Sequence, residues 1–148
     1  MKITSVKAIT VDEPVRSDVA IISAAGYHRD SYYVVVAIES DEGHTGFGEA
    51  TVQAVWSGET QQSALCAVRE IIAPNLIGQD PTHVAALADT MDRFLQVNSF
   101  TKAAVEMALL DLVGKKLGVP VHTLLGGPRR APRIRLRFSI GAFTPANA

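Results

Sequence analysis

The sequence contains little cysteine and few aromatic residues, and it has no long apolar run. One of its 148 residues is cysteine, one is tryptophan and 6% are aromatic. The single Cys66 excludes a disulfide framework within the chain, argues against a thiolate metal site and fits a reducing cytoplasm. No segment approaches the roughly 18 apolar residues that cross a membrane, and the N-terminus lacks the apolar region and cleavage site of a signal peptide. We therefore expect a cytoplasmic protein with no membrane partner.

The chain also lacks an excess of charge of either sign. Its 14 Lys and Arg residues nearly balance 15 Asp and Glu residues, which gives a formal net charge of -1. This balance argues against a nucleic-acid partner and favours a small neutral or acidic molecule. Five arginines cluster between residues 129 and 137, but no aromatic side chain lies between them to stack on bases. We interpret the cluster as a solvated strand face or a domain interface.

The length sets a further limit on the fold. A complete (β/α)₈ barrel needs about 250 residues, and at least about 200. A chain of 148 residues therefore cannot contain one. The hydrophobic share of 47% is enough for one globular domain with a sizeable core, or for one small domain and a part of another.

Three segments in the first third of the sequence have the composition of strands. Residues 2–11 are rich in β-branched types, residues 32–40 form a strongly apolar run, and residues 44–50 follow a turn at 41–43. These segments predict an antiparallel three-stranded meander. The segment 16–30 has small and polar residues without periodicity, which is typical of a functional loop.

The middle of the sequence shows helical periodicity. After Gly58 the apolar residues form one stripe, which Pro74 is predicted to end. Asp80–Pro81 has the pattern of an N-cap followed by a first helical residue, so a second helix is predicted to begin there. The two helices form a predicted hairpin that packs on the meander.

A third helix is predicted over residues 99–117, with Gly118 as its C-terminal stop. Between residues 103 and 113 only Glu106 and Asp111 are charged, so this helix is apolar almost all round. We expect it to lie buried between two layers. The two carboxylates lie on different helix faces and do not form an acid/base pair, and we expect them to make structural ion pairs or to cap facing backbone.

The last residues predict the start of a second architecture. Apolar and polar residues alternate over residues 134–140, which indicates a strand, and Thr144–Pro145 has the pattern of a helix start. The predicted fold class is therefore α+β, with an antiparallel meander packed on a helical hairpin and followed by the first elements of another unit. Because the sequence stops directly after the predicted helix start, we expect a truncated chain.

Familiar catalytic motifs do not occur in the sequence. The four histidines lie far apart and have no spacing typical of metal ligands, so we expect no internal metal site. Gly46 and Gly48 lie in a predicted hairpin rather than before a helix, which argues against a dinucleotide-binding loop. These glycines instead indicate a place where backbones or a ligand approach closely.

Two irregular segments carry the candidate binding residues. Tyr27 and His28, at the end of the first predicted loop, can offer donors and an apolar face to a ligand, or they are ordinary surface residues. Trp56 and Ser57 follow the third predicted strand, where the large ring suits a pocket wall or covers the local core. The residues alone leave these alternatives open.

Three longer segments then occur in a characteristic order. They are GFGEA at residues 46–50, PNLIGQDP at 74–81 and NSFTKAAVEMALLDLVGKKLGVPVHTLLGG at 98–127. Together they resemble the enolase superfamily, in particular its muconate-lactonizing-enzyme-like subgroup. The resemblance implies a capping domain with a linking helix over residues 1–127, and the first strand and helix start of a truncated TIM barrel over 128–148.

The resemblance also implies a chemistry for the whole enzyme. A Mg²⁺ ion held by three carboxylates on barrel strands would stabilise an enolate, and lysines would move a proton α to a carboxylate. The family places these groups on later barrel strands, so no catalytic or metal-binding residue is assigned in this chain. The expected partners are a small-molecule carboxylate substrate, the missing barrel domain and further copies of the chain in a homo-oligomer.

The resemblance further implies roles for the candidate binding residues. The segments with Tyr27, His28, Trp56 and Ser57 match two family loops that close over the substrate and set specificity. Ser139, on the predicted barrel strand, matches a position that often faces the substrate.

Muconate cycloisomerisation is the first candidate reaction. The alternatives within the superfamily are dipeptide epimerisation, N-acyl amino acid racemisation, o-succinylbenzoate synthesis and acid-sugar dehydration. A hypothesis from a different class is a stand-alone, non-catalytic capping or assembly domain.

Overall fold

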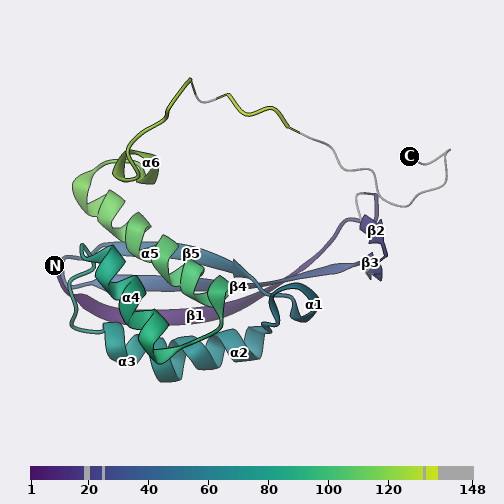
Figure 1. Cartoon of the computed structure of the whole chain (residues 1–148), viewed down its shortest axis with the longest axis horizontal. Helices are drawn as coiled ribbons and strands as arrows, with labels where there is room; N and C mark the ends of the chain where they lie inside the picture. Colours follow the sequence, from purple (N-terminus) through teal and green to yellow (C-terminus); the bar gives the residue numbers. More distant parts are fainter. Residues whose placement is uncertain (19–20, 25, 132, 137–148) are drawn as a thin grey trace.

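The computed structural model describes residues 1–18, 21–24, 26–131 and 133–136. Its centre is an antiparallel sheet of three strands in the order β1–β4–β5 (Figure 1). The strands are β1 (Ile3–Pro14), β4 (Asp30–Ser40) and β5 (Thr45–Thr51). The predicted meander is thus confirmed, and β1 and β4 extend further than predicted towards the segment that joins them.

The two faces of the sheet differ in what covers them. Val6, Val36 and Ile38 belong to the face beneath the helices, where they form a buried core with residues of every long helix. On the opposite face, Ile9 is 54% exposed and Phe47 is 53% exposed. Because successive strand residues point to opposite faces, the alternation of the sequence divides the sheet into a covered face and an open face.

Helices pack on the covered face, and their bounds follow the apolar periodicity. They are α1 (Ala54–Ser57), α2 (Gln61–Cys66), the π-helical η1 (Ala67–Ile72), α3 (Ala73–Leu76), α4 (Val84–Phe94), α5 (Ser99–Leu117) and α6 (Val121–Leu124). The segments α2, η1 and α3 run on without a break and pack beside β1 and β4. With α4 they form the predicted helical hairpin (Figure 1).

The first arm of this hairpin does not stop at Pro74, so that prediction is wrong. The Ala73 N–H donates to the Val68 carbonyl, five residues earlier, which is the bond of a π-helical turn. A proline inside a helix has no N–H and its ring crowds the preceding turn. The wider π-helical turn leaves room for the ring, and the helix continues to Leu76.

The second arm begins later than predicted. Asp80 does not cap α4, which starts at Val84. The Asp80 carboxylate instead accepts hydrogen bonds from the N–H and the hydroxyl of Thr82, at 2.9 and 2.8 Å. This side-chain turn uses the capping capacity of the aspartate before the helix begins.

The third helix, α5, has the predicted length and lies along β5. A Cβ added to Gly48 would lie 1.9 Å from the Ala104 carbonyl oxygen, and one added to Gly46 would lie 2.1 Å from that of Ala108. The close approach of two backbones expected at these glycines is therefore confirmed. Larger residues at either position would separate the helix from the strand.

The burial of α5 is one-sided within the described part of the chain. Leu109 and Leu112 are fully buried against the sheet, whereas Met107 is 44% exposed and Leu117 is 56% exposed. Glu106 is exposed as well. The sheet supplies one layer and no second layer of described residues lies over this face, so burial between two layers stays a prediction, with the barrel that the resemblance implies as the second layer.

Asp111 has the structural role predicted for it. Its carboxylate accepts a hydrogen bond of 2.8 Å from the Phe47 N–H on β5 and one of 2.7 Å from the Lys115 ammonium. The carboxylate thus joins the helix to the edge of the sheet and also forms an i,i+4 ion pair.

The segment between β1 and β4 contains a small hairpin rather than the predicted irregular loop. Its strands are β2 (Ile21–Ser23) and β3 (Gly26–His28), paired antiparallel. The hairpin projects from the ends of β1 and β4, on the side of the molecule where α1 lies (Figure 1). Sequence reasoning did not detect this hairpin, because it has only three residue pairs and no apolar periodicity.

The strand predicted over residues 134–140 is not formed in its described part. Residues 133–136 have no regular structure, and Ile134 and Leu136 are 86% and 91% exposed. A single strand without a partner cannot satisfy its backbone groups in a sheet, so it does not form alone. Residues 137–140, with Ser139, and the helix start at Thr144–Pro145 lie outside the described residues.

Candidate functional site

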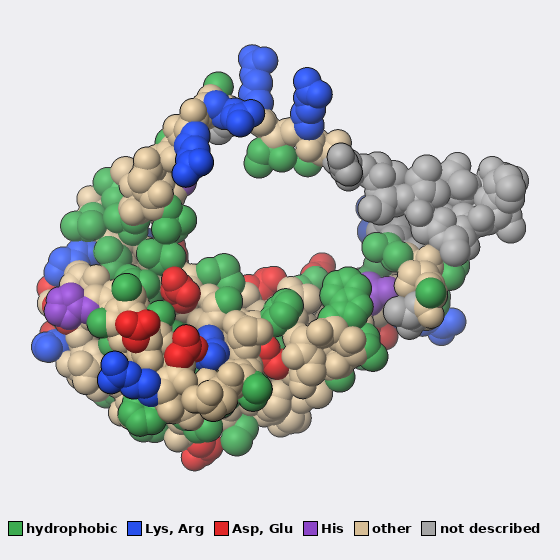
Figure 2. All heavy atoms as spheres, viewed as in Figure 1, with side chains coloured by type: hydrophobic (Ala, Val, Ile, Leu, Met, Phe, Trp, Pro, Cys, Tyr) green, Lys and Arg blue, Asp and Glu red, His purple; other side chains and the backbone are tan. Residues whose placement is uncertain are grey.

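A cavity of about 240 Å³ lies between the β2–β3 hairpin and α1. Three of the predicted binding residues line it, although they come from two distant segments: Tyr27 and His28 on β3, and Trp56 on α1. Figure 2 shows hydrophobic side chains on both sides of the place where the hairpin meets the rest of the molecule. Residues of the two predicted loops therefore line one cavity.

Trp56 forms a wall of this cavity and does not cover the core. Its side chain is 77% exposed, and the neighbouring Val55, which also lines the cavity, is 74% exposed. The short helix α1 contains no buried residue, and it ends at Gly58 with a left-handed φ of 70°. An exposed aromatic ring beside a concave surface is a common way to bind an apolar ligand group.

Ser57 does not line the cavity. Its hydroxyl donates to the Gln53 carbonyl at 3.1 Å and accepts from the Glu59 N–H at 3.2 Å. The side chain therefore closes the turn that carries Trp56. Direct contact between Ser57 and a ligand stays a prediction.

His28 and Tyr27 are held by contacts within the site. The His28 Nε2 lies 2.9 Å from the Ser31 Oγ, and both side chains line the cavity. The Arg29 guanidinium lies over the Tyr27 ring, 4.8 Å from its centre. The imidazole and the aromatic ring therefore have neighbours that restrict their orientation, and a role of these two residues in ligand binding stays a prediction.

Other lining residues were missed by sequence reasoning. Ser31 and Tyr33 on β4 face the cavity, together with Thr51 at the end of β5 and Gln53 after it. Tyr33 and Thr51 are paired in the sheet and belong to its open face. Strand alternation, counted from the buried Val34, could have placed Tyr33 and Ser31 on this face.

The lining groups suit binding more than catalysis. Among the described residues, those that line the cavity offer hydroxyls, one amide, one imidazole and apolar surface, but no carboxylate and no lysine. A hydrogen-bonding wall opposite an aromatic wall can orient a small molecule. Within the described residues, no group of three or more His, Cys, Asp or Glu side chains is placed to hold a metal ion.

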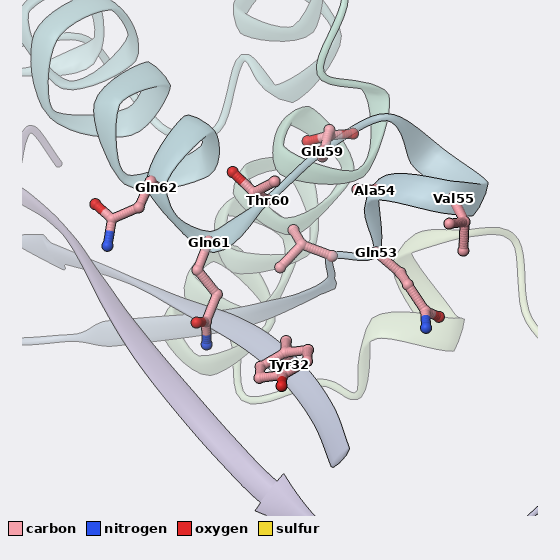
Figure 3. Close-up of a pocket in the computed structure, with 9 residues that line it drawn as sticks. Tyr32, Gln53, Ala54, Val55, Glu59, Thr60, Gln61 and Gln62 are labelled. Atoms are coloured by element: carbon pink, nitrogen blue, oxygen red, sulfur yellow. The ribbon is translucent and has the colours of Figure 1, made fainter. Parts of the chain in front are cut away.

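A second cavity, of about 420 Å³, also borders α1, and Figure 3 shows the residues that line it. Gln53 and Val55 line both cavities, whereas Tyr32 lines only the second and Tyr33 only the first. These adjacent tyrosines belong to opposite faces of β4. The helix α1 is therefore a thin partition between two cavities.

Glu59, two residues after the end of α1, is a buried carboxylate that sequence reasoning missed. It is 3% exposed and lines the second cavity. Its oxygens accept hydrogen bonds from the N–H groups of Phe100 and Thr101 at the start of α5, at 2.8 and 3.1 Å. No local pattern signals this contact, because the partners are about forty residues apart in the sequence.

The described residues contain no helix that is long and apolar enough to span a membrane.

Comparison with protein families gives one match that covers most of the chain. The model of the mandelate racemase / muconate lactonizing enzyme N-terminal domain matches residues 5–126. Both segments that form the first cavity lie within this range.

Individual relatives show the same similarity. A chloromuconate cycloisomerase from Cupriavidus pinatubonensis is 41% identical over 133 residues, which are 88% of this chain and 35% of that protein. The crystal structure of 2-chloromuconate cycloisomerase from Rhodococcus opacus superposes with a TM-score of 0.92 and 32% identity, covering 99% of this chain and 40% of that one.

A third similar structure carries a ligand. The dipeptide epimerase from Enterococcus faecalis, in complex with Mg and the dipeptide L-Leu-L-Tyr, has a TM-score of 0.80 and 29% identity, covering 86% of this chain and 35% of that one. The chain spans about a third of the length of the curated relatives it matches.

Proposed function

Because the chain belongs to the mandelate racemase/muconate lactonizing enzyme family of the enolase superfamily, we propose that it forms the capping part of an isomerase that acts on a small carboxylate substrate by α-proton chemistry. The cavity between the β2–β3 hairpin and α1 binds the part of the substrate that lies away from the reacting carbon. In this proposal residues 1–127 are the cap and 128–148 lead into the barrel, and the enzyme works in the cytoplasm as a homo-oligomer.

The observation that carries the proposal is the meeting of two sequence segments in one cavity. Tyr27 and His28 from the hairpin and Trp56 from α1 line the same space, although they lie far apart in the sequence. The family resemblance implies that these two segments set specificity. Ser57 supports the second segment through its turn, and Ser139 is proposed to complete the site from the barrel strand.

The metal implied by the family does not fit the described residues of this chain. The acidic side chains of this part are spread among separate contacts, and no group of three is gathered at the cavity or elsewhere. We therefore propose that the residues that hold Mg²⁺ and move the proton lie outside this chain. The dipeptide epimerase complex with Mg supports the use of this metal in the family. In this proposal the residues of this chain bind and orient the substrate.

Muconate cycloisomerisation is the first proposed reaction. The support is the identity of 41% to a chloromuconate cycloisomerase and the TM-score of 0.92 with a second one. A compact dicarboxylate would place its far end beside His28 and the hydroxyl of Ser31, which can both donate hydrogen bonds.

Dipeptide epimerisation is the second candidate, and a specific observation favours it. The cavity has apolar and aromatic walls formed by Ile21, Val55 and Trp56, which suit an apolar side chain of a dipeptide. The racemase alternative is supported by 34% identity to an N-succinyl-L-Arg/Lys racemase over 127 residues, whereas no specific observation favours the synthase or the acid-sugar dehydratase. A stand-alone assembly domain is the non-enzyme alternative.

A substrate panel tests the proposal with the full-length protein and Mg²⁺. We expect turnover of muconates or dipeptides, and a loss of about tenfold or more in kcat/KM when Trp56→Ala removes the aromatic wall. Phe94→Ala is the matched control, because Phe94 is an exposed aromatic residue (54%) on α4, outside the cavity. Equal kcat/KM in Trp56→Ala and wild type across the panel would remove the cavity from the proposal, and turnover by the 148-residue chain alone would contradict the placement of the catalytic groups.

A further inference from the structure

We propose that Glu59 is a positioning residue that fastens the Trp56-bearing helix α1 to the start of α5. The cavity wall and the long helix then move as one unit. The proposal rests on the proposed function only where it concerns substrate binding. The link itself is a property of the described chain.

The α5 side of the link replaces an ordinary helix cap. The first N–H groups of a helix have no partner within it and attract negative charge. Asn98, at the N-cap position, has a left-handed φ of 65° and makes no side-chain cap. Glu59 takes over this role through the Phe100 and Thr101 N–H groups, and the Thr101 hydroxyl also donates to its carboxylate.

This carboxylate has little freedom to move. Glu59 is 3% exposed and Thr101 is fully buried. A buried charge that loses its donors is strongly unfavourable, because the low-polarity interior offers it no replacement. Glu59 therefore holds its position on α5 as long as the domain is folded.

The α1 side of the link is a closed turn. The Glu59 N–H donates to the Ser57 hydroxyl, which donates in turn to the Gln53 carbonyl. The N–H of Ser57 donates to the same carbonyl at 2.9 Å, and that of Gly58 donates to the Ala54 carbonyl at 3.2 Å. These bonds make residues 53–59 one small unit that contains Trp56.

The side chains of α1 do not hold this unit in place by packing. The helix α1 has four residues and none of them is buried, and a single helical turn is unstable alone. The neighbouring buried residues are Val52 before it, at 2% exposed, and Glu59 after it. Figure 3 shows Glu59 and Thr60 on the stretch that leads from α1 towards α2. If Glu59 is released, α1 keeps only one of its two anchors.

A mere cap and a positioning link make different predictions. If Glu59 only caps α5, its replacement should loosen residues near Phe100 and leave α1 unchanged. If it links the two elements, a change on α5 should loosen α1, although no residue of α1 has been altered. Thr101→Val provides this change, because it removes the hydroxyl donor and retains the shape of the side chain.

Amide hydrogen exchange of the 148-residue chain is the test. In Glu59→Gln and Thr101→Val, we expect the Ser57 and Gly58 amides to exchange about tenfold faster or more, since a hydrogen bond to a charged group is lost. Thr101→Ser restores the hydroxyl and should return the exchange towards the wild-type rate. The local motion of Trp56, the only tryptophan, should increase in parallel in time-resolved fluorescence anisotropy.

Asp111→Asn is the control for general loosening. It weakens another contact between a carboxylate and a main-chain N–H, at the other end of α5, with no link to α1. Unchanged exchange of α1 in folded Glu59→Gln, or equal acceleration in Asp111→Asn, would overturn the proposal. If Glu59→Gln does not fold, the Thr101 pair decides the question by the same criteria.

Activity of the full-length protein separates this proposal from the proposed function. If both are right, Thr101→Val raises KM several-fold and changes kcat less. Faster exchange of α1 with unchanged KM for every substrate of the panel would support the link and contradict the role of the cavity in substrate binding.

Discussion

Gly48 on β5 faces the Ala104 carbonyl oxygen of α5 so closely that an added Cβ would lie 1.9 Å from it. A contact between two main chains cannot yield by rotation of a side chain. The spacing between the strand and the helix therefore depends on the absence of a side chain at this position.

The first prediction concerns this contact. Gly48→Ala should destabilise the chain by about 3 kcal/mol or more, because the helix must move away from a packed sheet. The measurement is urea unfolding followed by circular dichroism. Glu49→Ala, at the exposed neighbouring position, should change stability by less than about 0.5 kcal/mol. Equal unfolding midpoints for both variants would contradict the described packing.

The second prediction concerns the join between α5 and the sheet edge. Asp111→Ala removes the acceptor of the Phe47 N–H and the partner of Lys115. We expect a loss of about 1–2 kcal/mol in the free energy of unfolding. Glu106→Ala is the matched control, since Glu106 is an exposed carboxylate on the same helix. If the free energy of unfolding falls equally in the two variants, the contact with Phe47 does not contribute to stability.

The third prediction concerns the imidazole in the cavity. Ser31→Ala removes the hydroxyl that lies 2.9 Å from the His28 Nε2. The ¹⁵N chemical shifts of the His28 ring should change, because the tautomer is set by the partner of each nitrogen. If the cavity binds substrate as proposed, the substrate affinity of the full-length protein should fall about fivefold, the effect of one hydrogen bond.

Thr90→Ala provides the comparison for this experiment. The Thr90 hydroxyl donates to the Ala86 carbonyl on an exposed part of α4, outside the cavity. Its loss should leave both the His28 signals and the affinity unchanged. An unaltered His28 spectrum in Ser31→Ala would show that the serine does not orient the ring.

The fourth prediction concerns pH. The Lys116 side chain donates to Glu42 at 2.9 Å, and the terminal ammonium lies 3.2 Å from the same oxygen. The hydrogen bond from Lys116, followed by the one from the terminal ammonium, lowers the pKa of Glu42 from its ordinary value of 4.5. A carboxyl with a lowered pKa in the folded state contributes stability above its unfolded pKa, and this contribution is lost as the pH falls through the folded pKa.

Glu42→Gln should therefore lower stability at neutral pH and lose this difference from wild type in acid. The measurement is the unfolding midpoint in urea, compared for the two proteins from neutral pH to below the pKa of Glu42. A difference that stays constant over the whole range would show that the ion pair does not contribute.

The sequence predicts those features that depend on neighbouring residues. The β-branched and apolar segments gave the three main strands, and the stretch from Ser99 to Leu117 gave α5 with its correct ends. The predictions at Pro74 and Asp80 were wrong because they used only the usual preference of proline to end a helix and of aspartate to cap one. A π-helical turn absorbs the proline, and Thr82 takes the bonds of the aspartate.

In the candidate site, too, the residues that could be predicted are those whose role depends on their neighbours in the sequence. Tyr27, His28 and Trp56 could be singled out as chemically suited residues in irregular segments, and the family resemblance joined them. Strand alternation could have placed Ser31, whereas Thr51 needed the register that pairs it with Tyr33. Glu59 was beyond reach, because its role arises from contacts with residues about forty positions away.

Tyr32 and Tyr33 are neighbours in the sequence, yet each lines a different cavity. Two adjacent residues thus contribute to the walls of two different cavities. A substitution of one tyrosine can enlarge or fill the cavity that it lines and leave the other cavity unchanged. During divergence within a family, the shape of the candidate substrate cavity and that of the space behind it can therefore vary independently.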